Sequence, residues 1–360
     1  GGNFSSVKLT AIVSNLGGVG GFGAYTLSPD EIVKVDAELK KATNKPYNIN
    51  LWVSDYDLPP SNAAVDGGTA TAVAMKKATQ LLQPYFDELS IPLPEKPLSF
   101  SSRFENQVEG ILHTKPPVFS FVFGIPSANI LEQCRRLGII TAGAATTLDE
   151  ALALEAAGVD MIIASGFEGG GHRPSFLAAS ENSLVGTFVL VQQIREKTRT
   201  PVIAAGGIAN GKGIAAALAL GADAVQIGTA FLACEESNAL DIHREMLFSD
   251  QSKYSVLTRA FTGRLGRGLK SRISEEIRGR EEGLLPFPLQ TQLMSPIRQA
   301  AITQKKWELI LFWSGQIAPV LKHKRAADLM QALVEETNNY FAHRSAEAAP
   351  SVKDKFRRRQ

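Results

Sequence analysis

The sequence contains little cysteine and lacks the common metal-binding patterns. Cys134 and Cys234 are its two cysteines, and they lie far apart with no CxxC pair, which disfavours a disulfide framework and structural zinc. The five histidines are scattered, and no HExxH pair occurs. Neither a GxSxG nucleophile elbow nor a Walker phosphate loop is present. We therefore predict a protein without a metal centre, in a reducing cytoplasmic setting, whose chemistry comes largely from a bound cofactor.

Charge of one sign and long apolar runs are also scarce. The 360 residues carry 38 basic and 36 acidic side chains. The net charge of +2 is too small for non-specific electrostatic binding to nucleic acid or anionic lipid. No apolar run reaches about 18 residues, and the opening residues have no signal-peptide character. We expect a small-molecule partner, with no nucleic acid and no membrane. The absent initiator Met indicates that the chain begins partway into a longer sequence.

What the sequence does contain is a regular alternation of short apolar runs with helical stretches. From residue 118 onward the runs lack polar alternation, as expected of parallel strands that are covered on both faces. The runs are Gly18–Ala24, Tyr47–Val53, Val118–Gly124, Ile139–Ala145, Met161–Gly166, Val202–Gly207 and Ala224–Phe231. Seven such strands are one short of a closed barrel. We therefore predict an α/β fold, a TIM (β/α)8-type barrel that lacks one strand.

Two stretches are too long to be plain connections within this barrel. Residues 55–115 are predicted to be an insertion, and residues 232–345 a helical addition that packs on the barrel as a substrate lid. The helices expected in these stretches are Ala70–Leu89, 296–316 and 325–343. We assign residues 1–231 to the barrel with its insertion. The basic tail, residues 346–360, is expected to be disordered.

A glycine-rich segment near the N-terminus imitates a dinucleotide fingerprint. Gly18–Gly23 matches GxGxxG, but that fingerprint must open a helix directly at its last glycine. Here the helix signal starts later, with Ser28 as the cap, Pro29 at the first helical position and Glu31 at the third. We interpret the segment as a structural glycine-rich strand. Close approach of a flat ligand to it remains an alternative.

A second glycine cluster precedes His172 at the end of the strand Met161–Gly166. Active sites of barrels lie at this end of the strands, and glycines let backbone N–H groups approach a ligand closely. A neutral imidazole in that place could act as a general base, because its pKa is near the working pH. The alternative is a structural or solvated histidine.

Two further glycine-rich turns follow the last two predicted strands. Gly206 and Gly207 end one strand, and the run Gln226, Ile227, Gly228 and Thr229 ends the other. In barrels, the loops after strands seven and eight often bind phosphate through backbone N–H groups. These turns predict a phosphate-bearing ligand. Tight turns without a ligand are the alternative.

At these residues the chain resembles the nitronate monooxygenase family, formerly called 2-nitropropane dioxygenases. These are FMN-dependent barrels, and flavin enoyl-acyl-carrier-protein reductases are grouped with them. The resemblance runs from about residue 3 to about residue 320. It is carried by the motifs Val13–Gly20, Glu168–His172, Ala204–Ile208 and Val225–Phe231, with further matches at Thr258–Arg264 and Trp313–Gln316.

The resemblance implies roles for the residues of these motifs. His172 would be the catalytic base near the reactive edge of the flavin, and Asn50 would hydrogen-bond the isoalloxazine. The residues that would contact or hold FMN are Ser165, Gly166, Gly170, Gly171, Gly206, Gly207, Gln226, Ile227, Gly228 and Thr229. The implied reaction is oxidation of an alkyl nitronate, such as propionate 3-nitronate, by O2 to a carbonyl compound and nitrite. A second copy of the chain would be a further partner.

Two departures from the family pattern bear on these roles. Ser165 stands where many members have Gln, and the short side chain leaves a gap or a water near the flavin. Family members begin with a strand and a turn against the flavin that this sequence lacks, so two sheet edges and one side of the flavin site should be open. An NAD(P)H-dependent reductase of quinones or enoyl thioesters and a barrel that has lost its flavin are therefore alternative hypotheses.

Overall fold

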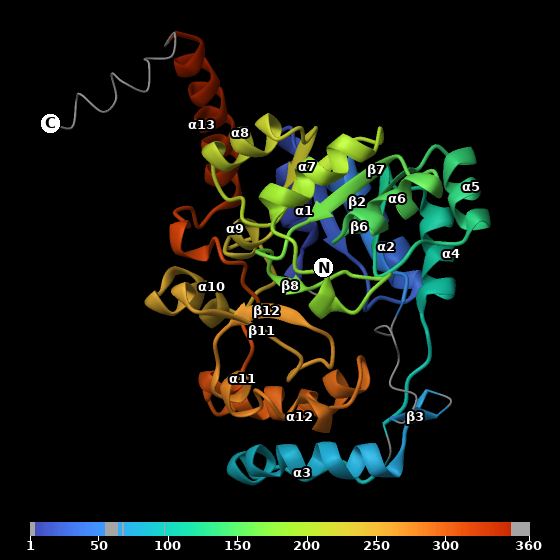
Figure 1. The fold of residues 1–360 in the computed structure, drawn as a ribbon, viewed down its shortest axis with the longest axis vertical. Helices are drawn as coiled ribbons and strands as arrows, with labels where there is room; N and C mark the ends of the chain where they lie inside the picture. Colours follow the sequence, from blue (N-terminus) through green and yellow to red (C-terminus); the bar gives the residue numbers. More distant parts are fainter. Residues whose placement is uncertain (1–3, 55–63, 67, 97, 347–360) are drawn as a thin grey trace, which may run out of the picture.

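The computed structural model describes residues 4–54, 64–66, 68–96 and 98–346. In Figure 1 these residues form two stacked parts, an upper one built on a sheet with flanking helices and a smaller lower one. Each part has a separate cluster of buried apolar side chains.

The upper part contains a seven-stranded sheet in the described residues, and all of its neighbouring strands are parallel. This finding confirms the predicted α/β barrel-like class. In spatial order the strands are β1 (Gly20–Gly23), β2 (Tyr47–Trp52), β5 (Val118–Val122), β6 (Ile140–Ala145), β7 (Met161–Ser165), β9 (Val202–Ala205) and β10 (Ala224–Gln226). The end strands β1 and β10 do not pair with each other, so the sheet is curled but open.

Helices cover the outer face of this sheet (Figure 1). They are α2 (Pro29–Ala42), α4 (Phe104–Thr114), α5 (Ala128–Arg136), α6 (Leu148–Ala156), α7 (Thr187–Lys197) and α8 (Gly211–Ala219). The predicted helix start is confirmed, because the Ser28 side chain accepts from the Glu31 N–H and the Glu31 carboxylate accepts from the Ser28 N–H. Helix α4 lies within the predicted insertion, yet its Val108 and Ile111 are buried in the same core as the strands.

The free edge of β1 is covered by helix α1 (Val7–Asn15) and the residues before it. The Thr10 hydroxyl donates to the Gly21 carbonyl at 3.2 Å, and the Gly23 N–H donates to Ser5 Oγ at 2.8 Å. A Cβ on Gly20 would lie 2.0 Å from the Thr10 carbonyl oxygen. The glycine-rich segment is therefore a strand, and close packing against α1 requires the glycine at position 20.

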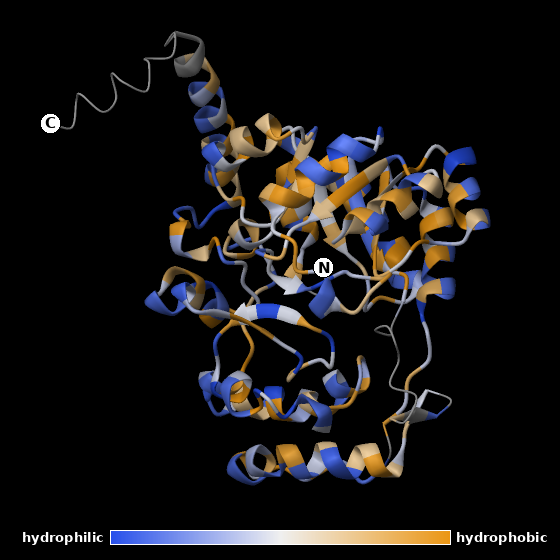
Figure 2. Cartoon of the chain, in the orientation of Figure 1, coloured by the Kyte–Doolittle hydropathy of each residue, from blue (hydrophilic) through white to orange (hydrophobic). Residues whose placement is uncertain are grey.

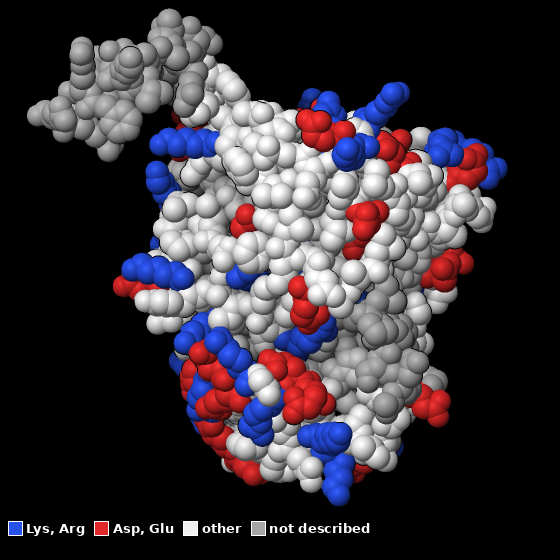
Figure 3. Space-filling view, in the orientation of Figure 1, with Lys and Arg blue, Asp and Glu red and all other residues white. Residues whose placement is uncertain are grey.

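The lower part is built from both stretches that the sequence places outside the barrel. Insertion helix α3 (Ala72–Leu89) shares a core with α11 (Arg272–Glu276) and α12 (Leu289–Thr303), where Phe86 and Leu293 are buried. In Figure 2, apolar and hydrophilic residues alternate along α3, as expected of a helix with one buried face. In Figure 3, charged side chains of both signs gather over this part.

The C-terminal addition also contains strands that the sequence did not indicate. β11 (Ser255–Thr258) pairs with β12 (Gly266–Leu269), and β12 pairs with β8 (Gly171–His172) from the loop after β7. The C-terminal addition is therefore joined to the barrel by backbone hydrogen bonds at the predicted base. α10 (Asp241–Phe248) precedes this hairpin.

Two predicted boundaries were wrong. The predicted strand Ala224–Phe231 ends at Gln226, because Thr229–Leu232 form the short helix α9. The predicted helix 296–316 lies at 289–303 as α12, because the chain leaves the helix at Lys305, where φ is 56°. The last predicted helix is α13 (Ala326–Ala346), and it packs against α8 of the upper part (Figure 1). The tail beyond Ala346 lies outside the described residues.

Candidate active site

The position of His172 is set by strand pairing and by a buried arginine. His172 pairs with Gly266 across the β8–β12 ladder. The next residue, Arg173, is buried and donates to the Gly166 carbonyl and to the Ser183 carbonyl, each at 2.8 Å. The loop after β7 is thereby tied back to its own strand end. His172 consequently occupies a fixed place at the carboxyl end of the sheet.

Aromatic rings surround the His172 imidazole on several sides. The ring centroid of Trp313 lies 4.9 Å from that of His172, Trp52 lies at 5.3 Å, Phe287 at 5.7 Å and Phe123 at 6.3 Å. Trp52 ends β2 and Phe123 follows β5, whereas Phe287 and Trp313 belong to the C-terminal addition. We call these four side chains the aromatic enclosure. The sheet and the C-terminal addition each supply two of these side chains.

A buried cation forms part of the same enclosure. The Arg264 guanidinium carbon lies 3.7 Å from the centroid of Phe123 and 4.5 Å from that of Phe287. Its side chain is fully buried and also donates to the Ser54 carbonyl. A buried guanidinium beside two aromatic faces favours an anion or a developing negative charge at this place.

The imidazole of His172 is neutral in these surroundings. Burial lowers the pKa of His172 to about 3, and the positive charge of Arg264 acts in the same direction. The ring has one hydrogen bond in the described structure, between Nε2 and the Thr262 hydroxyl at 2.9 Å. His172 therefore has a free lone pair at neutral pH, but the lowered pKa makes it a weaker base than the unperturbed histidine expected from the sequence.

The predicted phosphate turns expose unpaired backbone donors. Gly206 and Gly207 have φ of 109° and 71°, in the region that favours glycine. In the described residues, the N–H groups of Gly206, Gly207 and Gly228 donate to no protein acceptor. A Cβ on Gly228 would meet nothing within 4 Å, so open space lies beside this turn. In the part of the chain that the structure describes, these three peptide groups are free donors at the sheet end.

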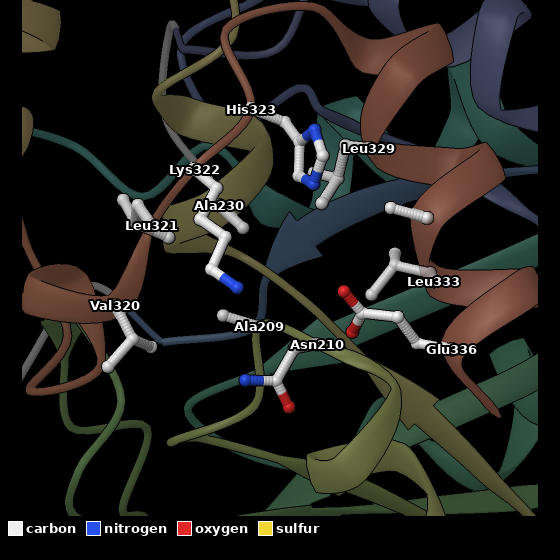
Figure 4. A pocket seen from close by; sticks show the side chains of 11 residues that line it. Ala209, Asn210, Ala230, Val320, Leu321, Lys322, His323, Leu329, Leu333 and Glu336 are labelled. Atoms are coloured by element: carbon white, nitrogen blue, oxygen red, sulfur yellow. The ribbon is translucent and has the colours of Figure 1, made fainter. Parts of the chain in front are cut away.

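The N-terminus of α8, in contrast, is already occupied by protein groups. Asn210 Oδ1 accepts from the Gly213 N–H at 3.0 Å, and Glu336 Oε2 accepts from the Gly211 N–H at 2.9 Å. In Figure 4, Asn210 and Glu336 line one small pocket together with Lys322. An anion is therefore not expected at the N-terminus of α8.

Two of the predicted glycines have a packing explanation. A Cβ on Gly166 would lie 1.8 Å from Thr187 Oγ1, and the Gly166 N–H already donates to the Ala205 carbonyl. A Cβ on Gly170 would lie 2.5 Å from the Gly315 nitrogen. These contacts account for glycine at both positions without a ligand. Gly171 lies in β8, and its φ of 85° lets the chain turn toward His172.

The remaining predicted residues are spread along the strand ends. Asn50 lies on the inner face of β2, where its Nδ2 donates to Ser120 Oγ at 2.9 Å. Ser165 ends β7 opposite Ala205. Gln226 is exposed at the end of β10, and Ile227 packs partly into the core. The Thr229 hydroxyl accepts from the Gly315 N–H at 2.9 Å, which joins this turn to the C-terminal addition.

The inner face of the sheet is lined largely by small side chains near these strand ends. Ala142, Ala144 and Ala205 form one cluster there with Ile163. Nearby, Asn48 Nδ2 donates to Ser120 Oγ, while the buried Asn48 Oδ1 has no partner. An unpaired buried acceptor next to small side chains is a place where a ligand donor would be stabilised.

The sequence assigned no site role to Thr262, to Arg264 or to any of the four aromatic residues of the enclosure. The signal that pointed to some of them was the pair of family-like stretches, Thr258–Arg264 and Trp313–Gln316, to which no role was assigned. Trp52 carries a weaker signal, because it lies two positions after Asn50 on the same strand and therefore near the same face. Phe123 and Phe287 have no sequence signal.

No group of His, Cys, Asp and Glu side chains suited to a metal ion occurs among the described residues. Among the helices that the structure describes, none is long and apolar enough to cross a bilayer.

Comparison with known proteins identifies the class of enzyme. The nitronate monooxygenase family matches residues 1–336. A probable nitronate monooxygenase of Staphylococcus aureus strain Newman is 35% identical over 338 residues, which cover 94% of this chain and 92% of the relative. Among solved structures, nitroalkane oxidase from Streptomyces ansochromogenes is similar with a TM-score of 0.84 and 32% identity, over 95% of this chain and 94% of that one.

A more distant solved structure shares the same fold. A mutant form of FabK from Thermotoga maritima has a TM-score of 0.67 and 26% identity, and the match covers 95% of this chain and 91% of that one. The family match and the curated relative both span nearly the whole chain. They indicate the same class of enzyme as the similar nitroalkane oxidase structure. The chain is a flavin-dependent oxidoreductase and belongs to the nitronate monooxygenase family, whose members oxidise nitronates.

Proposed function

We propose that this enzyme uses FMN and O2 to oxidise alkyl nitronates such as propionate 3-nitronate, releasing a carbonyl compound and nitrite. The observation that carries the proposal is the neutral His172 imidazole beside the buried Arg264 cation within one aromatic enclosure. A nitronate has a planar anionic head and an apolar chain, so the cation suits its head and the rings suit its chain. The similarity to a nitroalkane oxidase supports this substrate class.

The residues present fit FMN at the sheet end. The unpaired N–H groups of Gly206, Gly207 and Gly228 would hold the phosphate, because each lies in a turn with no protein acceptor. Asn48 and Asn50, on the inner face of β2, would bind the polar edge of the ring system, and the unpaired Asn48 Oδ1 is an acceptor without a protein donor. When bound, the flavin supplies the redox chemistry by taking electrons from the nitronate and passing them to O2.

We assign His172 as the base for neutral nitroalkanes. The imidazole would take a proton from the carbon next to the nitro group, and the electron pair of that C–H bond would become the nitronate anion. The imidazolium so formed carries positive charge beside Arg264, which costs energy in a buried site. Negative charge that develops on the nitro oxygens would offset this repulsion where it lies close to both cations.

The decisive experiment combines a visible spectrum with a nitrite assay. We expect the purified protein to be yellow and to release nitrite aerobically from propionate 3-nitronate without NAD(P)H. Bound flavin with no nitrite would overturn the proposed reaction. A folded but colourless protein would instead favour the flavin-free barrel. Size-exclusion chromatography of the same sample measures whether the predicted second copy is present.

A reductase is the second candidate, and the similarity to FabK is the observation that favours it. Such an enzyme would take hydride from NAD(P)H and reduce a quinone or an enoyl thioester. NADH would then bleach the flavin under anaerobic conditions. Bleaching at a rate that matches turnover, together with little nitrite from nitronates, would select this function over the oxidation of nitronates.

A further inference from the structure

The Thr262 side chain uses its full hydrogen-bonding capacity around one oxygen. Its Oγ1 donates to the Arg264 carbonyl at 3.0 Å and accepts from the Arg264 N–H at 3.3 Å. The third contact of this oxygen is His172 Nε2 at 2.9 Å. Thr262 is buried, so water does not readily replace any of these partners.

A hydroxyl group has one hydrogen and two lone pairs, and this inventory fixes the direction of the third bond. The single Thr262 hydrogen is committed to the Arg264 carbonyl, and the Arg264 N–H takes one lone pair. Only a lone pair remains for His172, so Nε2 must carry the hydrogen and donate it. The reverse direction would require the Thr262 hydrogen to leave the Arg264 carbonyl, which it contacts at 3.0 Å in a buried place.

The turn that carries Thr262 is held rigidly in place. Gly263 has φ of 80°, and a Cβ there would lie 2.4 Å from the Leu285 carbonyl oxygen. The Gly263 N–H donates to the Arg259 carbonyl, and the Arg259 guanidinium donates back to the Gly263 carbonyl, both at 2.8 Å. The β8–β12 pairing then fixes His172 opposite this turn. Both partners of the hydrogen bond are thus positioned by backbone contacts.

We propose that Thr262 is a positioning residue that holds His172 in the tautomer with hydrogen on Nε2 and leaves the Nδ1 lone pair as the proton acceptor. The proposal rests on the proposed base role of His172. In the described structure no group hydrogen-bonds to Nδ1, so this atom is free for substrate. The proton taken from carbon forms a new N–H bond at Nδ1. It does not pass on to Thr262, because both lone pairs of that hydroxyl are in use.

The test reads the tautomer directly by nitrogen NMR, so it does not depend on turnover. The protein is labelled with 15N in histidine, and the His172 signals are identified by their loss in His172→Gln. We expect an N–H type shift for Nε2 and a lone-pair type shift for Nδ1, with and without flavin. Hydrogen on Nδ1 in the unmodified chain would overturn the proposal.

Three variants separate the hydroxyl from its surroundings. Thr262→Ser keeps the hydroxyl and should keep the tautomer, whereas the isosteric Thr262→Val should give a mixture. Thr258→Val is the matched control, because Thr258 is equally buried in the same stretch and its hydroxyl accepts from the Ala260 N–H, not from His172. An unchanged His172 tautomer in a folded Thr262→Val protein would overturn the proposal. Loss of folding in that variant leaves the Ser and unmodified spectra as the deciding measurements.

Kinetics then distinguish this proposal from the proposed function. If both hold, Thr262→Val lowers kcat for neutral nitroalkanes by roughly tenfold, while oxidation of preformed nitronate, which needs no proton transfer, stays near normal. If the NMR result holds but His172→Gln keeps full nitroalkane turnover, the base role fails and the tautomer assignment stands. If the base role holds and Thr262→Val keeps full nitroalkane turnover, the positioning role fails.

Discussion

The guanidinium of Arg264 lies 3.7 Å above the ring of Phe123, and Phe123 holds an unusual backbone φ of 64°. A residue with a bulky side chain in this left-handed region costs about 1–2 kcal/mol. Such a conformation persists only where its surroundings fix it, and these positions are frequent at functional sites. The strain, the buried cation and the neutral imidazole of His172 therefore coincide at one place on the sheet end.

Removal of the Arg264 charge should weaken binding of anionic substrates. A hydrogen bond to a charged group contributes about 1.5–3 kcal/mol, so we expect the KM for a nitronate to rise roughly tenfold or more in Arg264→Met. Arg264→Lys keeps a cation and should show a smaller rise, although it loses the planar contact with Phe123. Nitrite release at varied substrate concentration measures KM, and thermal melting controls for folding. An unchanged KM in a folded Met variant would contradict the assigned role.

Replacement of His172 should separate neutral from anionic substrates. General-base catalysis contributes about 100-fold to 10,000-fold, so His172→Asn is expected to lower turnover of a neutral nitroalkane within that range. Turnover of the same compound, first converted to its nitronate with alkali, should fall far less because no proton remains to be removed. Both rates are measured on one flavin-loaded preparation. Equal losses for the two forms would show that His172 acts in binding or redox chemistry.

Stability should decrease with acid because two histidines are buried in the neutral form. Burial lowers the pKa of His172 to about 3 and that of His243 to about 4. The unfolded chain has histidine pKa values near 6.5, so below that pH the unfolded state binds protons that the folded state does not. The free energy of unfolding should then fall by roughly 1.4 kcal/mol per pH unit for each histidine. The stability that they contribute is thus present above about pH 6.5 and lost as the pH falls toward their folded values.

His243→Gln provides the control for this pH dependence. Glutamine can still donate to the Trp313 carbonyl, which His243 Nε2 contacts at 2.8 Å, but it does not titrate. The free energy of unfolding, measured with urea at about pH 7, 6 and 5, should fall less steeply with decreasing pH in the variant than in the unmodified chain. The same pH dependence of this free energy in both proteins would mean that His243 is not the source of the acid sensitivity.

Local patterns in the sequence were enough for most of the upper part. The strands β5, β6, β7 and β9 are largely apolar runs because both of their faces are covered, and the Ser28–Glu31 cap is complete within four residues. The boundary errors arose where one local pattern fits two kinds of structure. Most residues of Ala224–Phe231 are apolar, yet the chain turns at Gly228 into a short helix. Periodicity does not distinguish a strand from a buried helical turn over so few residues.

The candidate site was predictable only where its parts are local. The glycine turns at Gly206 and Gly228 could be found because a turn is encoded by adjacent residues. The β8–β12 pairing joins His172 to Gly266, which are far apart in sequence, and no local pattern specifies that register. Thr262 and Arg264 reach His172 through this pairing. The candidate base was therefore predictable from local patterns, whereas its hydrogen-bond partner Thr262 and the neighbouring cation Arg264 were not.

Close packing of α1 against β1 gives a prediction about stability alone. In Gly20→Ala the new Cβ would lie 2.0 Å from the Thr10 carbonyl oxygen, so the helix or the strand must move. We expect a loss of about 3 kcal/mol or more in the free energy of unfolding. Gly21→Ala is the matched control, because its nearest neighbour is the Asn48 amide nitrogen at 3.8 Å, an ordinary contact. Similar stabilities of the two variants would contradict the packing explanation.

The assignment of the phosphate site is tested by charge at Gly228. A Cβ added at Gly228 meets nothing within 4 Å, so Gly228→Ala and Gly228→Asp should both fold. The aspartate would place a negative charge beside the FMN phosphate, and we expect FMN affinity to fall at least tenfold in Gly228→Asp and little in Gly228→Ala. Riboflavin lacks the phosphate and should bind both variants alike. Fluorescence titration of the flavin-free proteins measures all four affinities. If the aspartate weakens riboflavin binding as much as FMN binding, the turn contacts another part of the flavin. Only the phosphate carries the charge that distinguishes the two ligands.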